Sequence, residues 1–236
     1  MKILFLCNEY PPAPHGGIGP VVRQLAEGLC QQGHDVDVAG LYRQPEDRIE
    51  TINGVRVHRL GGVVPGLRGD LCSRLKLTRY IETLHARRGF DLVEAPEWRG
   101  DSAMLRLNCP VVLRLHKSHV VCRRMAGDVR PSRLVRFFES LALKRSSAVC
   151  SVSSDIMRQT AEAFPAFRSR YAAKTIPVIY NAVETGLFCS GETLRERDLL
   201  VFVGSIKPAK GVENLLKAFA IIRSRLDCRL LLAGED

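Results

Sequence analysis

The chain of 236 residues is 46% hydrophobic, 25% charged and 6% aromatic, which is ordinary for a soluble globular protein, and it can hold one full domain plus part of another. No stretch approaches the roughly 18 apolar residues of a membrane helix, and the apolar run 3–7 is shorter than a signal-peptide core of about 7–15 residues. These features argue against a spanning segment or a secretory leader and predict a cytoplasmic protein, whose formal net charge of +10 favours anionic partners.

The first forty residues predict a strand, a loop, a helix and a second strand. The apolar residues 2–7 form the first strand, and the loop that follows contains three prolines, which exclude a helix there. From Ile18 onward apolar side chains recur three and four positions apart, as on the buried face of a helix, and Gly33 supplies the C-terminal cap. The second strand covers residues 35–40, so the Gly-Gly pair at 16–17 stands where the loop enters the helix.

The chain up to residue 180 continues this alternation of apolar strands and helices. The predicted strands cover residues 54–60, 91–95, 109–115, 147–151 and 175–180. The predicted helices cover residues 71–88, a segment that leads to 109, and two segments capped by Ser132 and by Ser153 or Ser154, with an irregular basic segment at 117–130. Strands that alternate with helices predict an α/β fold with a doubly wound, Rossmann-like parallel sheet.

A second unit follows a polar segment over residues 184–197, which we interpret as a linker. It begins with an apolar strand at 199–203, continues through the loop GSIKPAKG and a helix at 212–225, and reaches a strand at 229–233. We therefore expect one complete domain over residues 1–183 and the first β-α-β of an incomplete, truncated second domain over 198–236. A piece of about forty residues is too small to bury a core of its own.

The cysteines and the basic residues narrow the choice of partners. None of the eight cysteines forms a CxxC pair, and several lie in apolar runs, so we expect neither a disulfide framework nor a zinc site. The basic residues are spread among apolar helical positions instead of forming a dense run, which argues against nucleic acid. An anionic small molecule and peripheral contact with an anionic membrane, at its inner face, both remain open.

Four segments are expected to meet beyond the carboxyl ends of the strands, where ligands of open α/β sheets bind. They are the Gly-Gly pair with His15 before it, Glu97 and Trp98, His116, and the loop with Lys207 and Lys210. Glycine at 16–17 lets an anionic group approach backbone amides at a helix start, although a tight turn explains the pair equally well. No GxGxxG motif is present, so the usual dinucleotide fingerprint is absent.

Each of the other three segments has a functional and a structural interpretation. His116 ends an apolar strand and either faces the cleft or is a satisfied structural histidine. The indole of Trp98, beside Glu97, either offers a flat face to a sugar ring of an acceptor or anchors its loop. Lys210, followed by a glycine at a helix start, either binds a phosphate or is a solvated surface lysine.

Taken in order, six segments resemble retaining glycosyltransferase family 4, which has the two-domain GT-B fold. The N-terminal resemblance rests on PPAPHGGIGPVVRQLAEGLCQQGHDVDV, DLVEAPEW, VVLRLH and FFESLALKRSSAVCSVSSDI. The segments VIYNAVETGLF and LVFVGSIKPAKGVENLLKAF resemble the passage into the second domain and its opening. Coverage runs essentially from end to end, and the order of the six makes the resemblance specific.

The resemblance implies transfer of a sugar from a nucleotide-sugar donor, such as a UDP- or GDP-sugar, with retention at the anomeric carbon and without a metal or other cofactor. The acceptor is then a glycan or a lipid-linked molecule. By resemblance, His116 contacts the transferred sugar as the catalytic residue. The implied donor-binding residues are Gly16, Gly17, Ser205 and Lys210, and the implied acceptor-side residues are Tyr10, His15, Glu97 and Trp98.

The chain also departs from the family pattern. Ser205 stands where the family often has an arginine that binds the diphosphate, and Ala209, Ala182 and Glu184 replace a glutamate, a glycine and an aspartate. The acidic E-x7-E element that grips the donor lies beyond the final LLLAGED. We therefore consider three hypotheses: part of a working glycosyltransferase that is not active alone, a non-catalytic module that binds an acceptor or a partner, and an unrelated nucleotide-binding Rossmann protein.

Overall fold

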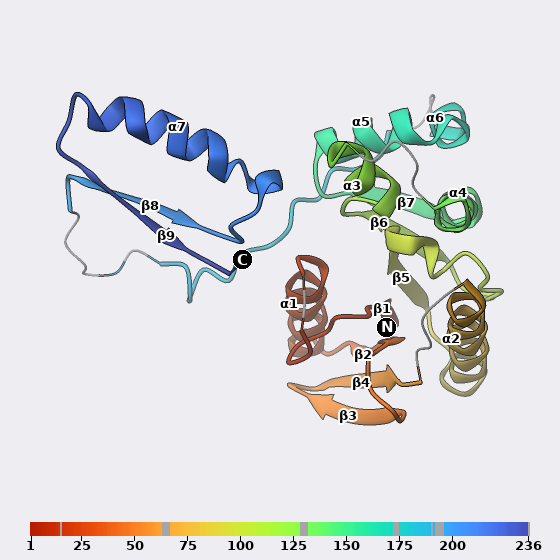
Figure 1. Cartoon of the computed structure of the whole chain (residues 1–236). Coiled ribbons are helices and arrows are strands. Elements are labelled where there is room, and N and C mark those ends of the chain that lie inside the picture. The colour runs from red at the N-terminus through yellow and green to blue at the C-terminus, as the bar shows by residue number, and fades with distance from the viewer. Residues whose placement is uncertain are drawn as a thin grey trace. The chain divides into compact units, whose positions relative to one another are not determined.

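The computed structural model describes residues 1–14, 16–62, 67–127, 132–171, 175–189, 191 and 196–235. The chain divides into two compact units, Met1–Glu184 and Thr185–Asp236, and each is described by itself (Figure 1). No helix in the described ranges combines the length and the apolar character needed to cross a bilayer.

The first unit is built on a seven-stranded sheet in the order β3-β4-β2-β1-β5-β6-β7. All neighbouring strands are parallel except β3, which pairs antiparallel with β4 at one edge. The strands are β1 (Lys2–Leu6), β2 (Asp35–Leu41), β3 (Arg48–Ile52), β4 (Val55–Leu60), β5 (Leu92–Pro96), β6 (Val111–Leu115) and β7 (Ala148–Ser151). The predicted α/β class with a parallel sheet is confirmed. The order of the strands reverses between β1 and β5, and this is the place where such sheets bind ligands.

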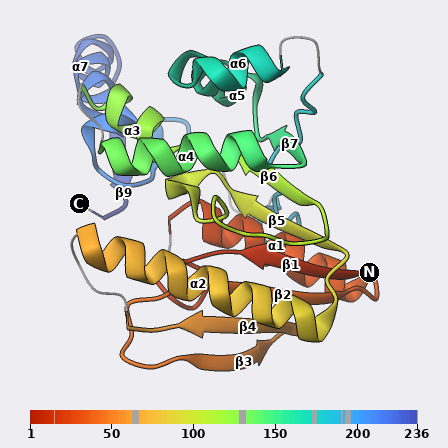
Figure 2. The ribbon, with the colours of Figure 1, turned by 90° about the vertical axis from the view of Figure 1, so that its right-hand side faces the viewer.

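Helices cover both faces of this sheet. They are α1 (Ile18–Gln31), α2 (Leu67–Arg88), α3 (His119–Met125), α4 (Arg133–Arg145), α5 (Ser154–Ala163) and α6 (Pro165–Tyr171), with a 3₁₀ turn η1 (Trp98–Gly100). Alternate residues of β1 face opposite sides, so that Ile3 packs with Val22 of α1 and Leu4 packs in the core that includes Leu77 of α2 and Phe138 of α4. In Figure 2, α2 and α4 lie in front of the sheet and α1 lies behind it.

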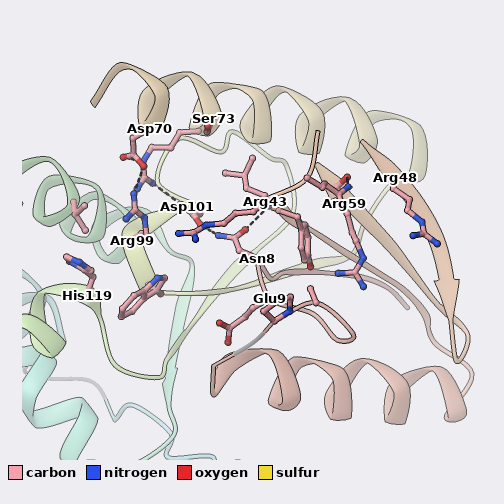
Figure 3. Close-up of a pocket in the computed structure, with 18 of the residues that line it drawn as sticks. Asn8, Glu9, Arg43, Arg48, Arg59, Asp70, Ser73, Arg99, Asp101 and His119 are labelled. Carbon is pink, nitrogen blue, oxygen red and sulfur yellow. Dashed lines mark hydrogen bonds and ion pairs between the residues drawn. The ribbon is translucent and has the colours of Figure 1, made fainter. Parts of the chain in front are cut away.

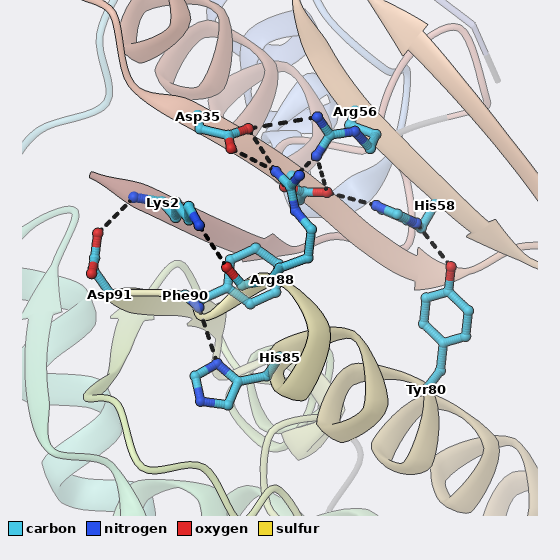
Figure 4. Close-up of polar contacts among 10 residues, drawn as sticks. Lys2, Asp35, Arg56, His58, Tyr80, His85, Arg88, Phe90 and Asp91 are labelled. Carbon is cyan, nitrogen blue, oxygen red and sulfur yellow. Dashed lines mark hydrogen bonds and ion pairs between the residues drawn. The ribbon is translucent and has the colours of Figure 1, made fainter.

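A buried polar cluster ties β2, β4 and α2 together away from the ligand-binding edge (Figure 4). The carboxylate of Asp37 accepts hydrogen bonds from His58 at 2.8 Å, Arg56 at 3.1 Å and Arg88 at 3.0 Å. The other imidazole nitrogen of His58 lies 2.8 Å from the hydroxyl of Tyr80. Burial raises the pKa of Asp37, but His58 and the two arginines outweigh it and hold the pKa below its ordinary value. This cluster therefore stabilises the fold and lines neither of the pockets described below.

The second unit consists, in its described part, of β8 (Leu199–Val203), a 3₁₀ turn η2 (Pro208–Lys210), α7 (Val212–Arg223) and β9 (Arg229–Ala233). The strands β8 and β9 pair in parallel, so the predicted β-α-β is present. Apolar side chains stay exposed on it, including Val203 at 80% and Ile221 at 62%. A unit of this size leaves much of its apolar surface in contact with solvent, as the sequence predicts.

Two secondary-structure elements of the first unit, a strand and a helix, were not predicted from the sequence. The hairpin strand β3 was not predicted because its residues alternate poorly and Ile49 remains exposed. Its turn nevertheless carries a recognisable signal, Asn53-Gly54, and both residues have positive φ, at 49° and 86°. The basic segment expected to be irregular contains the helix α3, whose N-cap Ser118 accepts a hydrogen bond from the amide of Val121.

Two other predictions placed elements that the structure does not have. No helix lies in residues 99–109 beyond the 3₁₀ turn η1, because the chain turns sharply at Arg99 and Gly100, both at positive φ. The predicted strand 175–180 reduces to a single bridge between Ser151 and Val178. Pro177 lacks the N–H that a longer ladder needs at this point.

Candidate functional site

Two adjoining pockets open at the carboxyl ends of the strands of the first unit. The larger pocket, of about 1280 Å³, is lined mainly by the ends of β1 and β2, the first half of α2 and the turn η1. The smaller pocket, of about 430 Å³, is lined by the loop before α1 and the ends of β5 and β6. Asn8, Glu9, Trp98 and Asp101 line both pockets. The pockets thus lie at the carboxyl ends of the strands, where the sequence predicts a site, and beside the reversal of strand order.

A hydrogen-bonded cluster of three polar side chains forms the wall that the two pockets share. The amide of Asn8 donates to Asp101 at 2.6 Å, while its oxygen accepts the N–H of Leu41 at 2.8 Å. Arg74 donates to the same carboxylate at 3.0 Å, and Figure 3 shows Asn8 and Asp101 side by side. Burial raises the pKa of Asp101, and Arg74 opposes this rise. These hydrogen bonds tie the end of β1 to β2 and, through Asp101, to α2.

The Gly-Gly loop is bound by a carboxylate of the chain itself. Glu9 accepts hydrogen bonds from the backbone N–H groups of Gly16 at 3.0 Å, Ile18 at 2.8 Å and Gly19 at 2.8 Å. A carboxylate suits the N-terminus of α1, where unpaired amides and the helix dipole favour negative charge. A Cβ at Gly17 would meet nothing within 4 Å. The donor-binding role of Gly16 and Gly17 stays a prediction, and it requires the donor to share or replace Glu9.

His116 follows β6 and lines the smaller pocket beside Lys117. Burial and then the charge of Arg114 lower the pKa of its imidazole to about 4, so the ring is neutral near pH 7. The carboxylate of Glu97, which is fully buried, accepts the N–H of His116 at 2.9 Å and of Lys117 at 2.6 Å. Lys117 has a φ of 152°, which is unusual for a residue with a side chain. Glu97 therefore holds the backbone that presents His116.

Glu139 of α4 has a similar task, which the sequence analysis missed. Its fully buried carboxylate accepts N–H groups from Arg99 at 3.0 Å, His119 at 2.7 Å and Val120 at 3.2 Å. Burial raises its pKa, and the three amides oppose the rise. A glutamate on the otherwise apolar face of a predicted helix is the signal that could have identified it.

The predicted acceptor-side residues divide into two groups. Trp98 lines both pockets, and its ring packs edge-on against His119 at 5.4 Å between centroids. Tyr10 and Glu97 are fully buried and line neither pocket, because Tyr10 packs in the core under the loop and Glu97 binds backbone amides. They support the pocket walls instead of touching a ligand. His15 lies outside the described residues.

The predicted donor residues of the second unit lie in its first loop. Lys210 ends η2, and Gly211 after it has a φ of 74°, which favours glycine. The backbone oxygen of Ser205 accepts the N–H of Lys207 at 2.9 Å. In the ranges that the structure covers, no three His, Cys, Asp or Glu side chains are grouped to hold a metal ion.

Comparison with known proteins agrees with this architecture. Residues 16–174 match the family described as "Glycosyl transferase 4-like domain". An uncharacterised glycosyltransferase of Methanocaldococcus jannaschii is 27% identical over 256 residues, covering 100% of this chain and 63% of that protein. Sucrose-phosphate synthase from Thermosynechococcus elongatus has a TM-score of 0.70 at 22% identity, covering 99% of this chain and 62% of that chain.

A second solved structure is the catalytic domain of starch synthase IV from Arabidopsis thaliana bound to ADP and acarbose. It has a TM-score of 0.65 at 14% identity, covering 99% of this chain and 68% of that chain. These likenesses confirm the expected GT-B-type fold. The chain spans less than two thirds of the length of the Methanocaldococcus relative and of the sucrose-phosphate synthase.

Proposed function

Because the chain belongs to the family of glycosyl transferase 4-like domains, we propose that it takes part in moving a sugar from a nucleotide-sugar to an acceptor, with retention of the anomeric configuration. The donor is a nucleoside diphosphate sugar, and a neighbour of the same fold binds ADP. The acceptor is a glycan or a lipid-linked molecule, reached in the cytoplasm or at the inner face of a membrane. No metal or other cofactor is needed in this proposal.

The observation that carries the proposal is the neutral imidazole of His116 in the smaller pocket, next to a lysine and an indole. A neutral imidazole can hydrogen-bond a sugar hydroxyl without attracting the diphosphate away from its own site. The leaving diphosphate develops negative charge, which the cation of Lys117 in this pocket can stabilise. The sugar becomes oxocarbenium-like, so holding it in position matters more than a nucleophile.

In the same proposal, the donor-binding residues of the first unit are Gly16 and Gly17, which bind the diphosphate through their backbone, and those of the second unit are Ser205 and Lys210. Glycines leave room for a phosphate at a helix start, and a lysine adds charge without a metal. Trp98 offers its ring to the acceptor, since a flat indole packs well on a sugar.

The test is turnover by the protein with UDP-, GDP- and ADP-sugars and mixed glycan and lipid-linked acceptors. Wherever a glycosylated product forms, we expect its anomeric proton, followed by nuclear magnetic resonance, to show the configuration of the donor. His116→Ala should lower the rate about 100-fold. His34→Ala, at a half-buried histidine that lines neither pocket, should leave it unchanged. An inverted product would refute retention, and equal rates for the two variants would refute the role of His116.

A second function is a non-catalytic module that binds an acceptor. It is favoured by the fact that the described residues that line the two pockets all belong to the first unit. Binding of an acceptor without turnover of any nucleotide-sugar would support this alternative over catalysis by this chain.

A further inference from the structure

The larger pocket has an unusual density of charge on its wall (Figure 3). Its lining residues include five arginines, namely Arg43, Arg48, Arg59, Arg74 and Arg99, and four carboxylates, namely Glu9, Glu50, Asp70 and Asp101. What such a wall can bind depends on which of these charges are already paired within the protein.

At the β3 side of the pocket, one carboxylate forms ion pairs with two arginines. Glu50 lies 3.0 Å from Arg48 and 2.5 Å from Arg59. Arg59 also donates to the backbone oxygens of Tyr10 at 2.8 Å and Pro11 at 3.0 Å. Each nitrogen of the Arg59 guanidinium thus has a partner in Glu50 or in the proline-rich loop, and both oxygens of Glu50 face an arginine.

At the α2 side, the carboxylates are also engaged. Arg74 is buried and pairs with Asp70 at 3.2 Å and with Asp101 at 3.0 Å. Arg99 pairs with the other oxygen of Asp70. The remaining carboxylate, Glu9, accepts three backbone N–H groups of the loop before α1. Every acidic group on the wall therefore has a partner within the protein.

Arg43 is the exception among the arginines of this wall. It comes two residues after the end of β2, is exposed, and extends into the pocket in Figure 3. No described residue forms an ion pair or hydrogen bond with its side chain. A guanidinium presents five N–H donors in a fork that matches the oxygens of a phosphate.

We propose that the larger pocket binds an acceptor that carries a phosphate group, with Arg43 as the main phosphate ligand. The identification of this ligand as the acceptor rests on the proposed function, whereas the phosphate site itself does not. A phosphate would form charge-assisted hydrogen bonds between opposite charges with the exposed guanidinium of Arg43, which a neutral sugar cannot form. Trp98 lines the same pocket and can pack on the attached sugar.

The pocket volume bears on the size of this acceptor. At about 1280 Å³ it exceeds the usual ligand-pocket range of roughly 300–1,000 Å³. The phosphate can therefore belong either to a soluble sugar phosphate or to the headgroup of a lipid. Both present the same oxyanion to Arg43, so the experiment must separate the two sources.

The first arm is calorimetry with the 236-residue chain and no donor, comparing glucose 6-phosphate with glucose. We expect the phosphate to improve affinity about tenfold or more, and Arg43→Gln to remove that gain. The matched control is Arg168→Gln, which removes the same charge from an exposed arginine of α6. Equal loss in the two variants would show only general charge attraction and would overturn the proposal.

The second arm is co-sedimentation with vesicles of phosphatidylcholine that contain or lack phosphatidylinositol. Arg43-dependent binding to the phosphatidylinositol vesicles alone would assign the phosphate to a lipid, and Arg43-dependent binding of glucose 6-phosphate alone would assign it to a soluble sugar. If neither arm depends on Arg43, the proposal is wrong. Both arms measure binding without a donor, so failed turnover and a failed phosphate site remain distinguishable.

Discussion

The two pockets share one rim but use their carboxylates in different ways. Beside the smaller pocket, Glu97 is buried and accepts the backbone N–H groups of His116 and Lys117, so it fixes this loop and leaves a neutral histidine on the wall. On the wall of the larger pocket, Glu50 and Asp70 pair with arginines and leave one cation in excess. A carboxylate that accepts backbone N–H groups thus accompanies a weakly charged pocket, whereas carboxylates that pair with arginines accompany a cationic one.

The turn η1 joins the two pockets, and its disruption should have the largest effect. A Cβ at Gly100 would lie 2.3 Å from the backbone of Phe138, and Gly100 has a φ of 66°. We expect Gly100→Ala to lower the free energy of unfolding by about 4 kcal/mol, measured by urea denaturation, since a backbone clash adds to backbone strain. Gly28→Ala is the matched control, because its Cβ meets nothing within 4 Å on α1. It should stabilise by about 0.5–1 kcal/mol.

Removal of one buried carboxylate tests whether the loops depend on it. Glu139→Ala leaves three backbone N–H groups without their acceptor, and we expect the free energy of unfolding to fall by about 3 kcal/mol. Glu162→Ala, at an exposed glutamate of α5 paired only with Arg158, should cost less than about 0.5 kcal/mol. If the two variants cost the same, the backbone contacts of Glu139 do not hold these loops.

The titration of Glu97, which holds the loop beside the smaller pocket, should make the stability of the protein depend on pH. Burial raises the pKa of this carboxyl from 4.5 to about 7 in the folded protein, so the folded state binds a proton that the unfolded state has lost. The free energy of unfolding should therefore be largest below pH 4.5, fall by about 3 kcal/mol between pH 4.5 and 7, and level off above that range.

Denaturation curves at pH 5 and pH 8 check this expectation, with Glu97→Gln as the comparison. The variant has no ionisable group at this position, so its free energy of unfolding should change less between the two pH values. An equal change in both proteins would show that another group is responsible.

The sequence predicted the sheet better than it predicted the loops that make the site. Strands such as β8 and β9 are apolar runs between turn signals, and the prediction matches their bounds. The roles of Glu97 and Glu139 depend on contacts between residues about 20 and 40 positions apart, as in the bond from Arg99 to Glu139. No local pattern contains such contacts. His116 and Trp98 were located because both follow strands, and strand ends define where the pockets lie.

The smallest expected effect concerns Glu9, which lines both pockets and occupies the amides that the donor phosphate is predicted to use. Glu9→Gln keeps the shape of the side chain but weakens the cap of α1, which should cost about 1 kcal/mol of unfolding free energy. Glu27→Gln, at a carboxylate of the same helix that pairs with Arg23 and lines neither pocket, is the control.

Affinity for ADP or UDP, measured by calorimetry, then decides between two roles of Glu9. If the diphosphate replaces Glu9 at the N–H groups of Gly16 and Ile18, the variant should bind nucleotide more tightly than the native protein, because a neutral amide competes less well than a carboxylate. If Glu9 instead holds the loop in shape for the donor, the variant should bind more weakly. The first result would make the Gly-Gly loop a phosphate site in its own right, and the second would limit it to a structural turn between the two pockets.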